Sequence, residues 1–166
     1  MGFEHFRVEL RGGCTRYAEA DETIRRLPHV RLDPDPAPLP RSIFYVMDDG
    51  THVLELELMD SPVHLSCRFT LCHPPSVDGV FLGLIRELMV RLGMEVRICD
   101  DVRPEHARSF SLDEFAEFSA ATPHYIAVRR AEWIAAFGDQ RIGATTNEVY
   151  QRVILPQCQP GLQQPT

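Results

Sequence analysis

The stretch that decides the fold is residues 41–99, which read RSIFYVMDDGTHVLELELMDSPVHLSCRFTLCHPPSVDGVFLGLIRELMVRLGMEVRIC. Its first half holds three runs of alternating apolar and polar residues, separated by Asp49-Gly50 and Asp60-Ser61-Pro62. A period of two is typical of strands, because successive side chains point to opposite faces of a sheet. Asp-Gly favours a tight hairpin turn. This half therefore predicts an antiparallel meander of strands 41–47, 52–59 and 63–72.

The two turns set the register that we expect. A two-residue turn at Asp49-Gly50 pairs Met47 with His52, and the second turn pairs Leu58 with Val63. Both pairings place the same apolar residues on one face, which supports the assignment. This predicted inner face consists of Ile43, Tyr45, Met47, Leu54, Leu56, Leu58, Val63, Leu65, Cys67, Phe69 and Leu71.

The second half of the stretch predicts a helix and one more strand. Ser76 is suited to cap a helix whose apolar residues recur at helical spacing up to Leu92, and Gly93 is suited to end it. Residues 94–99 alternate again and predict a strand parallel to strand 63–72, because a helix connects the two.

The flanking segments complete the predicted order. Residues 3–10 predict a strand, residues 15–27 a helix, and the alternate prolines of residues 33–40 an extended connector. After residue 100 we expect three helices, the first opened by Ser111, the second by Thr122-Pro123 and the third by Thr145. The prediction is an α+β fold of order β-α-β-β-β-α-β followed by three helices. It is loosely similar to the ferredoxin-like fold and to secretion chaperones, in a single domain at 1–155 with a flexible tail at 156–166.

The composition limits the class of protein. The chain has 24 acidic and 17 basic residues, a net charge of −7, which disfavours a nucleic-acid binder because such proteins neutralise phosphates with basic residues. No apolar run approaches the ~18 residues of a membrane helix. The five cysteines fit no disulfide pattern, so we expect a cytoplasmic protein.

No metal site or cofactor is predicted with specific ligands. His64, Cys67, Cys72 and His73 follow one another along a strand, but a strand places them on opposite faces or far apart. Side chains of other elements do gather, because three predicted elements end at the same end of the sheet. The resulting candidate cluster consists of Asp49, His52, His73, Asp100, Asp101 and His106.

The opposite face of the meander is the second candidate site, an interface with another protein chain. It presents apolar residues among polar ones, and the predicted register places charged groups beside them. The candidate interface residues are Phe44, Val46, Val53, Glu55 and Arg68. Either the C-terminal helices or a second copy of the chain should cover this face, so a homodimer is one expectation.

These observations favour a non-catalytic module that binds another protein, one with a basic surface. Immunity proteins, adaptors and chaperones are the classes that such a module resembles in size and charge. No short catalytic motif occurs, so we lean against an enzyme. The alternative is a small metal-assisted hydrolase or ligand-binding domain that uses the Asp/His cluster.

Overall fold

The computed structural model describes residues 5–13, 16–33, 40–71, 73, 75–99 and 108–137. These residues form a mixed set of helices and strands. The elements in chain order are β1 (His5–Arg11), α1 (Tyr17–Arg25), β2 (Val30–Leu32), β3 (Ser42–Asp48), β4 (Val53–Asp60), β5 (Val63–Thr70), α2 (Val77–Leu92), β6 (Glu95–Ile98), β7 (Ser109–Phe110) and α3 (Phe115–Phe137).

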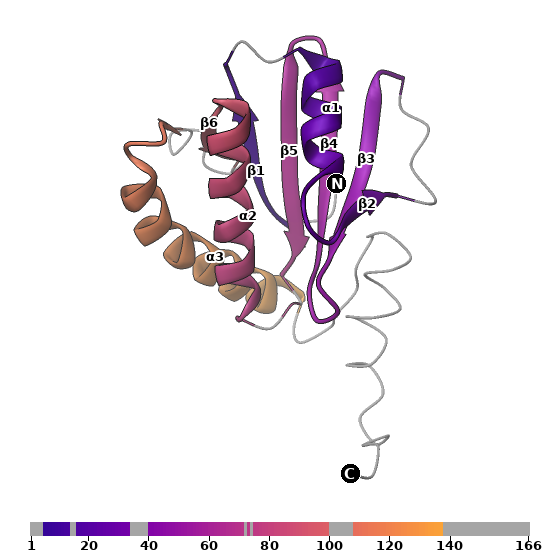
Figure 1. The fold of residues 1–166 in the computed structure, drawn as a ribbon. Coiled ribbons are helices and arrows are strands. Elements are labelled where there is room, and N and C mark those ends of the chain that lie inside the picture. The colour runs from indigo at the N-terminus through magenta and orange to yellow at the C-terminus, as the bar shows by residue number, and fades with distance from the viewer. Residues whose placement is uncertain are drawn as a thin grey trace.

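The strands form one sheet in the order β2-β3-β4-β5-β1-β6-β7, and each described pair of neighbours is antiparallel. Helices α1 and α2 lie side by side on one face of this sheet, and α3 runs from the β6 side toward the end of the sheet (Figure 1). The predicted α+β class is confirmed. Strands β5 and β6 run in the same direction, as predicted, but β1 lies between them. The two short strands β2 and β7 were not predicted.

Both hairpins are displaced by two residues from the predicted register. Met47 pairs with Leu54 instead of His52, because four residues, 49–52, form the turn. Leu58 pairs with Leu65 instead of Val63, because Asp60 already pairs with Val63 across Ser61-Pro62. A shift of two residues leaves every side chain on its predicted face.

The core lies between the sheet and the two helices of its inner face. Four residues of the predicted inner face, Leu54, Leu56, Leu65 and Phe69, are buried in one cluster with Phe81, Leu84 and Leu88 of α2 and Ile98 of β6. Alternate residues of β1 join them, since Phe6, Val8 and Leu10 are buried as well. The inner face of the meander, α2, β6 and β1 therefore share one core.

The predicted helix start at Thr122-Pro123 is wrong, because α3 continues through both residues. The Thr122 hydroxyl donates to the carbonyl of Phe118 at 2.8 Å, one helical turn back, instead of capping a new helix. Phe118 and Ile126, one turn on either side, are fully buried. Burial of this face holds the helix together across the proline. The helix predicted at Thr145 lies outside the described residues, as do residues 34–39 of the connector and the tail 156–166.

Within the described part of the chain, no helix combines the length and the apolar character needed to cross a lipid bilayer.

The turn after β1 allows a test of how closely it packs against α2. Gly13 has a φ of +75°, and a Cβ there would lie 2.9 Å from the carbonyl oxygens of Leu92 and Gly93. Gly12 has a φ of +82°, but no atom lies within 4 Å of the corresponding position. The positive φ costs either alanine variant about 1–2 kcal/mol. We expect Gly13→Ala to lower the free energy of unfolding by at least ~1 kcal/mol more than Gly12→Ala in urea titrations, since only the former meets backbone atoms. Equal losses would show that α2 moves aside at no cost.

Candidate functional site

Three polar side chains form a hydrogen-bonded chain where the β3–β4 turn meets the start of α2. His52 Nδ1 lies 3.0 Å from Asp49 Oδ2, and His52 Nε2 lies 2.9 Å from Ser76 Oγ. His52 is 7% exposed, whereas Ser76 is exposed. The order is thus an acid, an imidazole and a hydroxyl at the surface, which we call the Asp-His-Ser chain.

The turn holds Asp49 in the orientation that this chain needs. Its Oδ1 accepts backbone N–H groups of Thr51 at 2.8 Å and His52 at 2.7 Å, so Oδ2 is directed to the imidazole. Partial burial by itself would raise the pKa of the Asp49 carboxyl, but the hydrogen bonds from the His52 side chain and from both backbone groups outweigh it and lower the pKa to about 2. The carboxyl is therefore ionised at neutral pH. An ionised Asp49 can only accept, so Nδ1 of His52 carries the proton between them; in the neutral imidazole, Nε2 is then an acceptor that faces the Ser76 hydroxyl.

His73 fixes the backbone next to this chain. Its Nε2 accepts the N–H of Val53 at 3.1 Å, and its Nδ1 lies 3.0 Å from the carbonyl oxygen of Thr70. The ring is 3% exposed, and burial lowers the pKa of His73 to about 4. His73 is therefore neutral at pH 7 and ties the end of β5 to the residue that follows His52.

Arg130 of α3 contacts the same end of the sheet. Its guanidinium donates to Asp78 Oδ1 at 3.1 Å and approaches the carbonyl oxygens of Leu71 and His73 at 3.4 and 3.5 Å. Asp78 stands in the first turn of α2, where its charge would oppose a second anion. The ion pair with Arg130 offsets that charge beside Ser76.

The candidate cluster is thus brought together in part. The structure places Asp49 against His52, and His73 against the neighbouring Val53, whereas Asp100, Asp101 and His106 lie outside the described residues. Among the described residues, no group of three or more His, Cys, Asp or Glu side chains could hold a metal ion. Ser76 and Arg130 are the two members that were not predicted from the sequence. Ser76 was expected only as a helix cap.

The face of the sheet opposite α1 and α2, the outer face, differs from the prediction in its exposure. Val46 and Val53 are fully buried within one chain and Glu55 is 5% exposed, so neither valine calls for a second copy to cover it. The register shift places Arg68 directly opposite Glu55, and its Nε donates to Glu55 Oε2 at 3.0 Å. His5 Nε2 lies 3.8 Å from the same oxygen.

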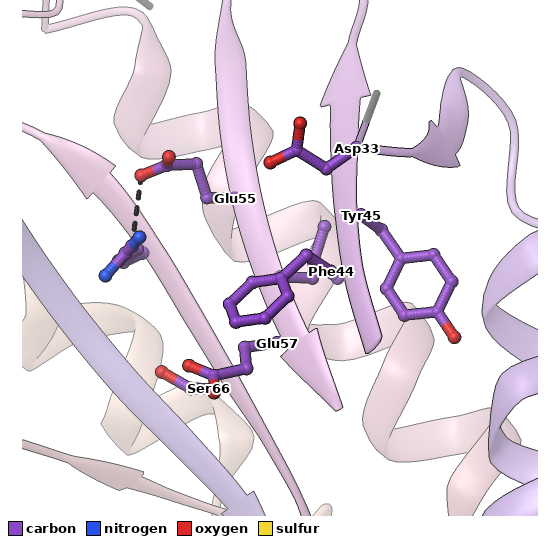
Figure 2. A pocket seen from close by; sticks show the side chains of 8 residues that line it. Asp33, Phe44, Tyr45, Glu55, Glu57 and Ser66 are labelled. Atoms are coloured by element: carbon purple, nitrogen blue, oxygen red, sulfur yellow. Dashed lines mark hydrogen bonds and ion pairs between the residues drawn. The ribbon is translucent and has the colours of Figure 1, made fainter. Parts of the chain in front are cut away.

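A shallow hollow, open to solvent and with a cavity volume of about 20 Å³, remains on this face. It is lined by Asp33, Phe44, Tyr45, Glu55, Leu56, Glu57, Ser66 and Arg68. Figure 2 shows the half-buried ring of Phe44 across β4, with Glu55 and Glu57 on either side and Asp33 nearby. The Ser42 hydroxyl donates to Glu57 Oε1 at 3.0 Å and so holds that carboxylate at the rim. Three carboxylates and one guanidinium give the hollow a net negative charge.

Comparison of the chain with protein-family models, with curated proteins and with solved structures found no match in any of the three.

Proposed function

We propose that this protein is an accessory or regulatory module that binds another protein through the hollow on its outer face. The observation that carries the proposal is the placement of Phe44 among the carboxylates of Asp33, Glu55 and Glu57. An aromatic ring and carboxylates together suit a lysine or arginine side chain, which can stack on the ring while its charge is neutralised. The partner is therefore a protein that presents a basic segment.

The charge of the whole chain supports the same class of partner. A net charge of −7 attracts a basic surface at long range and speeds its encounter. Glu55 itself is already paired with Arg68, so Glu57 and Phe44 are the groups at the rim that a partner would meet.

The test uses a short fluorescent peptide of alternating lysine and arginine, with binding followed by anisotropy. We expect Glu57→Gln and Phe44→Ala each to weaken binding about tenfold, the effect of losing one charge-assisted or cation–π contact. Raising the salt concentration should weaken binding of the peptide to the unaltered protein more than to Glu57→Gln, because the variant has one fewer charge pair for salt to screen.

Glu87→Gln is the matched control, since Glu87 is a half-exposed glutamate of α2 on the other side of the sheet. It removes the same charge and should leave binding within about twofold. Equal losses in Glu57→Gln and Glu87→Gln would show binding to net charge alone and would refute the hollow as the site. A dimeric mass in light scattering that Phe44→Ala abolishes would likewise replace the basic partner by a second copy.

A further inference from the structure

The Asp-His-Ser chain has the connectivity of a nucleophile, its general base and the group that orients the base. His52 bridges Asp49 and Ser76 through its two ring nitrogens, at 3.0 and 2.9 Å. Both distances are those of direct hydrogen bonds, and the exposed member is the one that carries the nucleophilic oxygen. Such a constellation is recognised by its geometry and the role of each group, whatever the chain order.

The hydroxyl of Ser76 is not engaged where a serine at this position is normally engaged. Ser76 directly precedes α2 and already has helical backbone angles, φ −58° and ψ −21°, so its side chain makes no capping hydrogen bond and lies against His52. An N-cap serine usually stabilises its helix by accepting a backbone N–H. With a neutral imidazole protonated at Nδ1, the hydroxyl would donate to His52 Nε2 at 2.9 Å, which is the arrangement that prepares an oxygen for attack.

The start of α2 supplies the stabilising field that an attack would need. The helix dipole places partial positive charge at this end of α2. The N–H of Asp78 already donates to the carbonyl of Pro75 at 3.1 Å, so the stabilisation would come from the dipole and from the other first-turn N–H groups. The opposing charge of Asp78 is offset by its ion pair with Arg130 at 3.1 Å. Negative charge that develops on an oxygen beside Ser76 would therefore be stabilised.

We propose that Ser76 is a nucleophile for acyl transfer, with His52 as its general base, and that its substrates are small carboxylic esters. The Ser76 oxygen bonds to the ester carbonyl carbon as its proton passes to His52 Nε2. The carbon–oxygen bond to the alcohol then breaks, and the alcohol leaves with that proton. Water attacks the acyl-serine, again giving its proton to His52, and the carboxylic acid leaves as Ser76 regains its hydrogen. Asp49 is a positioning residue throughout.

This activity would be separate from protein docking, because α2 covers the inner face of the sheet (Figure 1), whereas Phe44 lines the hollow on the outer face. The two proposals can therefore fail independently. Loss of ester chemistry in a Ser76 variant should leave peptide binding unchanged, and Phe44→Ala should leave ester chemistry unchanged.

The experiment treats the full chain with a fluorophosphonate probe, which labels activated serines, and locates the label by mass spectrometry of peptides. We expect a label on Ser76 that Ser76→Ala abolishes. His52→Gln should slow labelling at least about 100-fold, the usual contribution of a general base, and Asp49→Asn at least about tenfold. Hydrolysis of p-nitrophenyl acetate should fall in the same order.

Ser111→Ala is the control, because Ser111 is also a hydroxyl at the start of a helical segment but bonds to Glu114 at 2.9 Å. It should leave labelling unchanged. Thermal melts of each variant separate loss of chemistry from loss of fold, and Ser76→Cys, tested with iodoacetamide, supplies a second nucleophile at the same position. An unlabelled wild-type protein would overturn the proposal. So would equal labelling of wild type and a folded His52→Gln variant, which would leave the chain as a structural link between the turn and the helix.

Discussion

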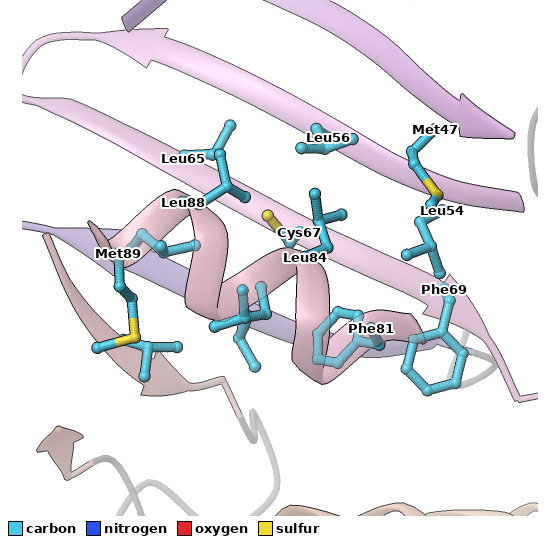
Figure 3. Close-up of a cluster of buried hydrophobic side chains, with 14 of the residues drawn as sticks. Met47, Leu54, Leu56, Leu65, Cys67, Phe69, Phe81, Leu84, Leu88 and Met89 are labelled. Atoms are coloured by element: carbon cyan, nitrogen blue, oxygen red, sulfur yellow. The ribbon is translucent and has the colours of Figure 1, made fainter. Parts of the chain in front are cut away.

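Replacing Phe69 by alanine should lower the free energy of unfolding by about 3–5 kcal/mol, the usual cost of truncating a phenylalanine in a core. Phe69 is fully buried, and its ring lies 5.0 Å from that of Phe81 and 5.8 Å from that of Phe6. Figure 3 shows Phe69 of β5 beside Phe81 of α2, so the pair joins the sheet to the helix that covers it. The loss combines the transfer free energy of the ring with the cavity that it leaves.

Phe44→Ala is the matched control, because it removes the same side chain from the outer face, where the ring is only half-buried. We expect less than half the loss there, measured for both variants by urea denaturation with the midpoint and slope compared. Similar losses at the two positions would mean that the outer face is packed as tightly as the core. That result would argue against an open hollow at Phe44.

The faces of the central strands were predictable from the sequence, whereas the register was not. Alternation specifies which side chains share a face, but a register shifted by two residues gives the same faces. The turns were expected at Asp49-Gly50 with two residues and at the second hairpin with four, and the structure reverses this. The Asp49 side chain accepts the N–H groups of Thr51 and His52. These hydrogen bonds favour a turn of four residues over one of two. Both registers differ from the prediction by two residues, so the predicted inner face is unchanged.

The place of β1 between β5 and β6 could not be predicted from local pattern. Its alternating residues Phe6, Val8 and Leu10 indicate a strand with one buried face, but any edge of the meander could have received it. The pairing of Glu9 with Ser66 on one side and Arg97 on the other is decided by long-range packing. In the same way, Pro123 was expected to start a helix because proline suits that position, and burial around it overrides the local preference.

The position of the candidate site at one end of the sheet was predictable from the sequence, whereas its hydrogen bonds were not. The topology places the β3–β4 turn, the end of β5 and the start of α2 at one end of the sheet, so Asp49, His52 and His73 were expected together. The contact between His52 and Ser76 joins residues 24 positions apart. It depends on the four-residue turn, which leaves His52 outside the strand pairing. The local pattern around Ser76 indicates only a helix cap and carries no information about this contact.

The unfolding free energy should fall by about 3 kcal/mol between pH 7 and pH 4 through His73 alone. Burial lowers the pKa of His73 from 6.5 to about 4, and each tenfold loss of proton affinity corresponds to ~1.4 kcal/mol. Between these two pH values the unfolded chain binds a proton that the folded chain does not. Stability therefore rises with pH in this window, is fully present above about pH 6.5 and is lost as the pH falls toward 4.

Burial penalises the charged ring, and protonation would also cost His73 a hydrogen bond. Both ring nitrogens would then be donors, and Nε2 could no longer accept the N–H of Val53, which is 0% exposed and has no access to water. His73→Gln removes the titration but keeps a group that can both accept and donate. Its unfolding free energy, measured by urea titration from pH 7 down to pH 4, should therefore lose about 3 kcal/mol less than that of wild type.

His124→Gln controls for the loss of a histidine as such, because His124 is exposed on α3. It should leave the wild-type pH dependence in place. A His73→Gln variant that follows the wild-type curve would show that His73 is protonated in the fold and that its bond to Val53 is dispensable. In that case the backbone beside His52 would be held by the Asp49 turn alone, and the geometry on which Ser76 depends would persist in acid.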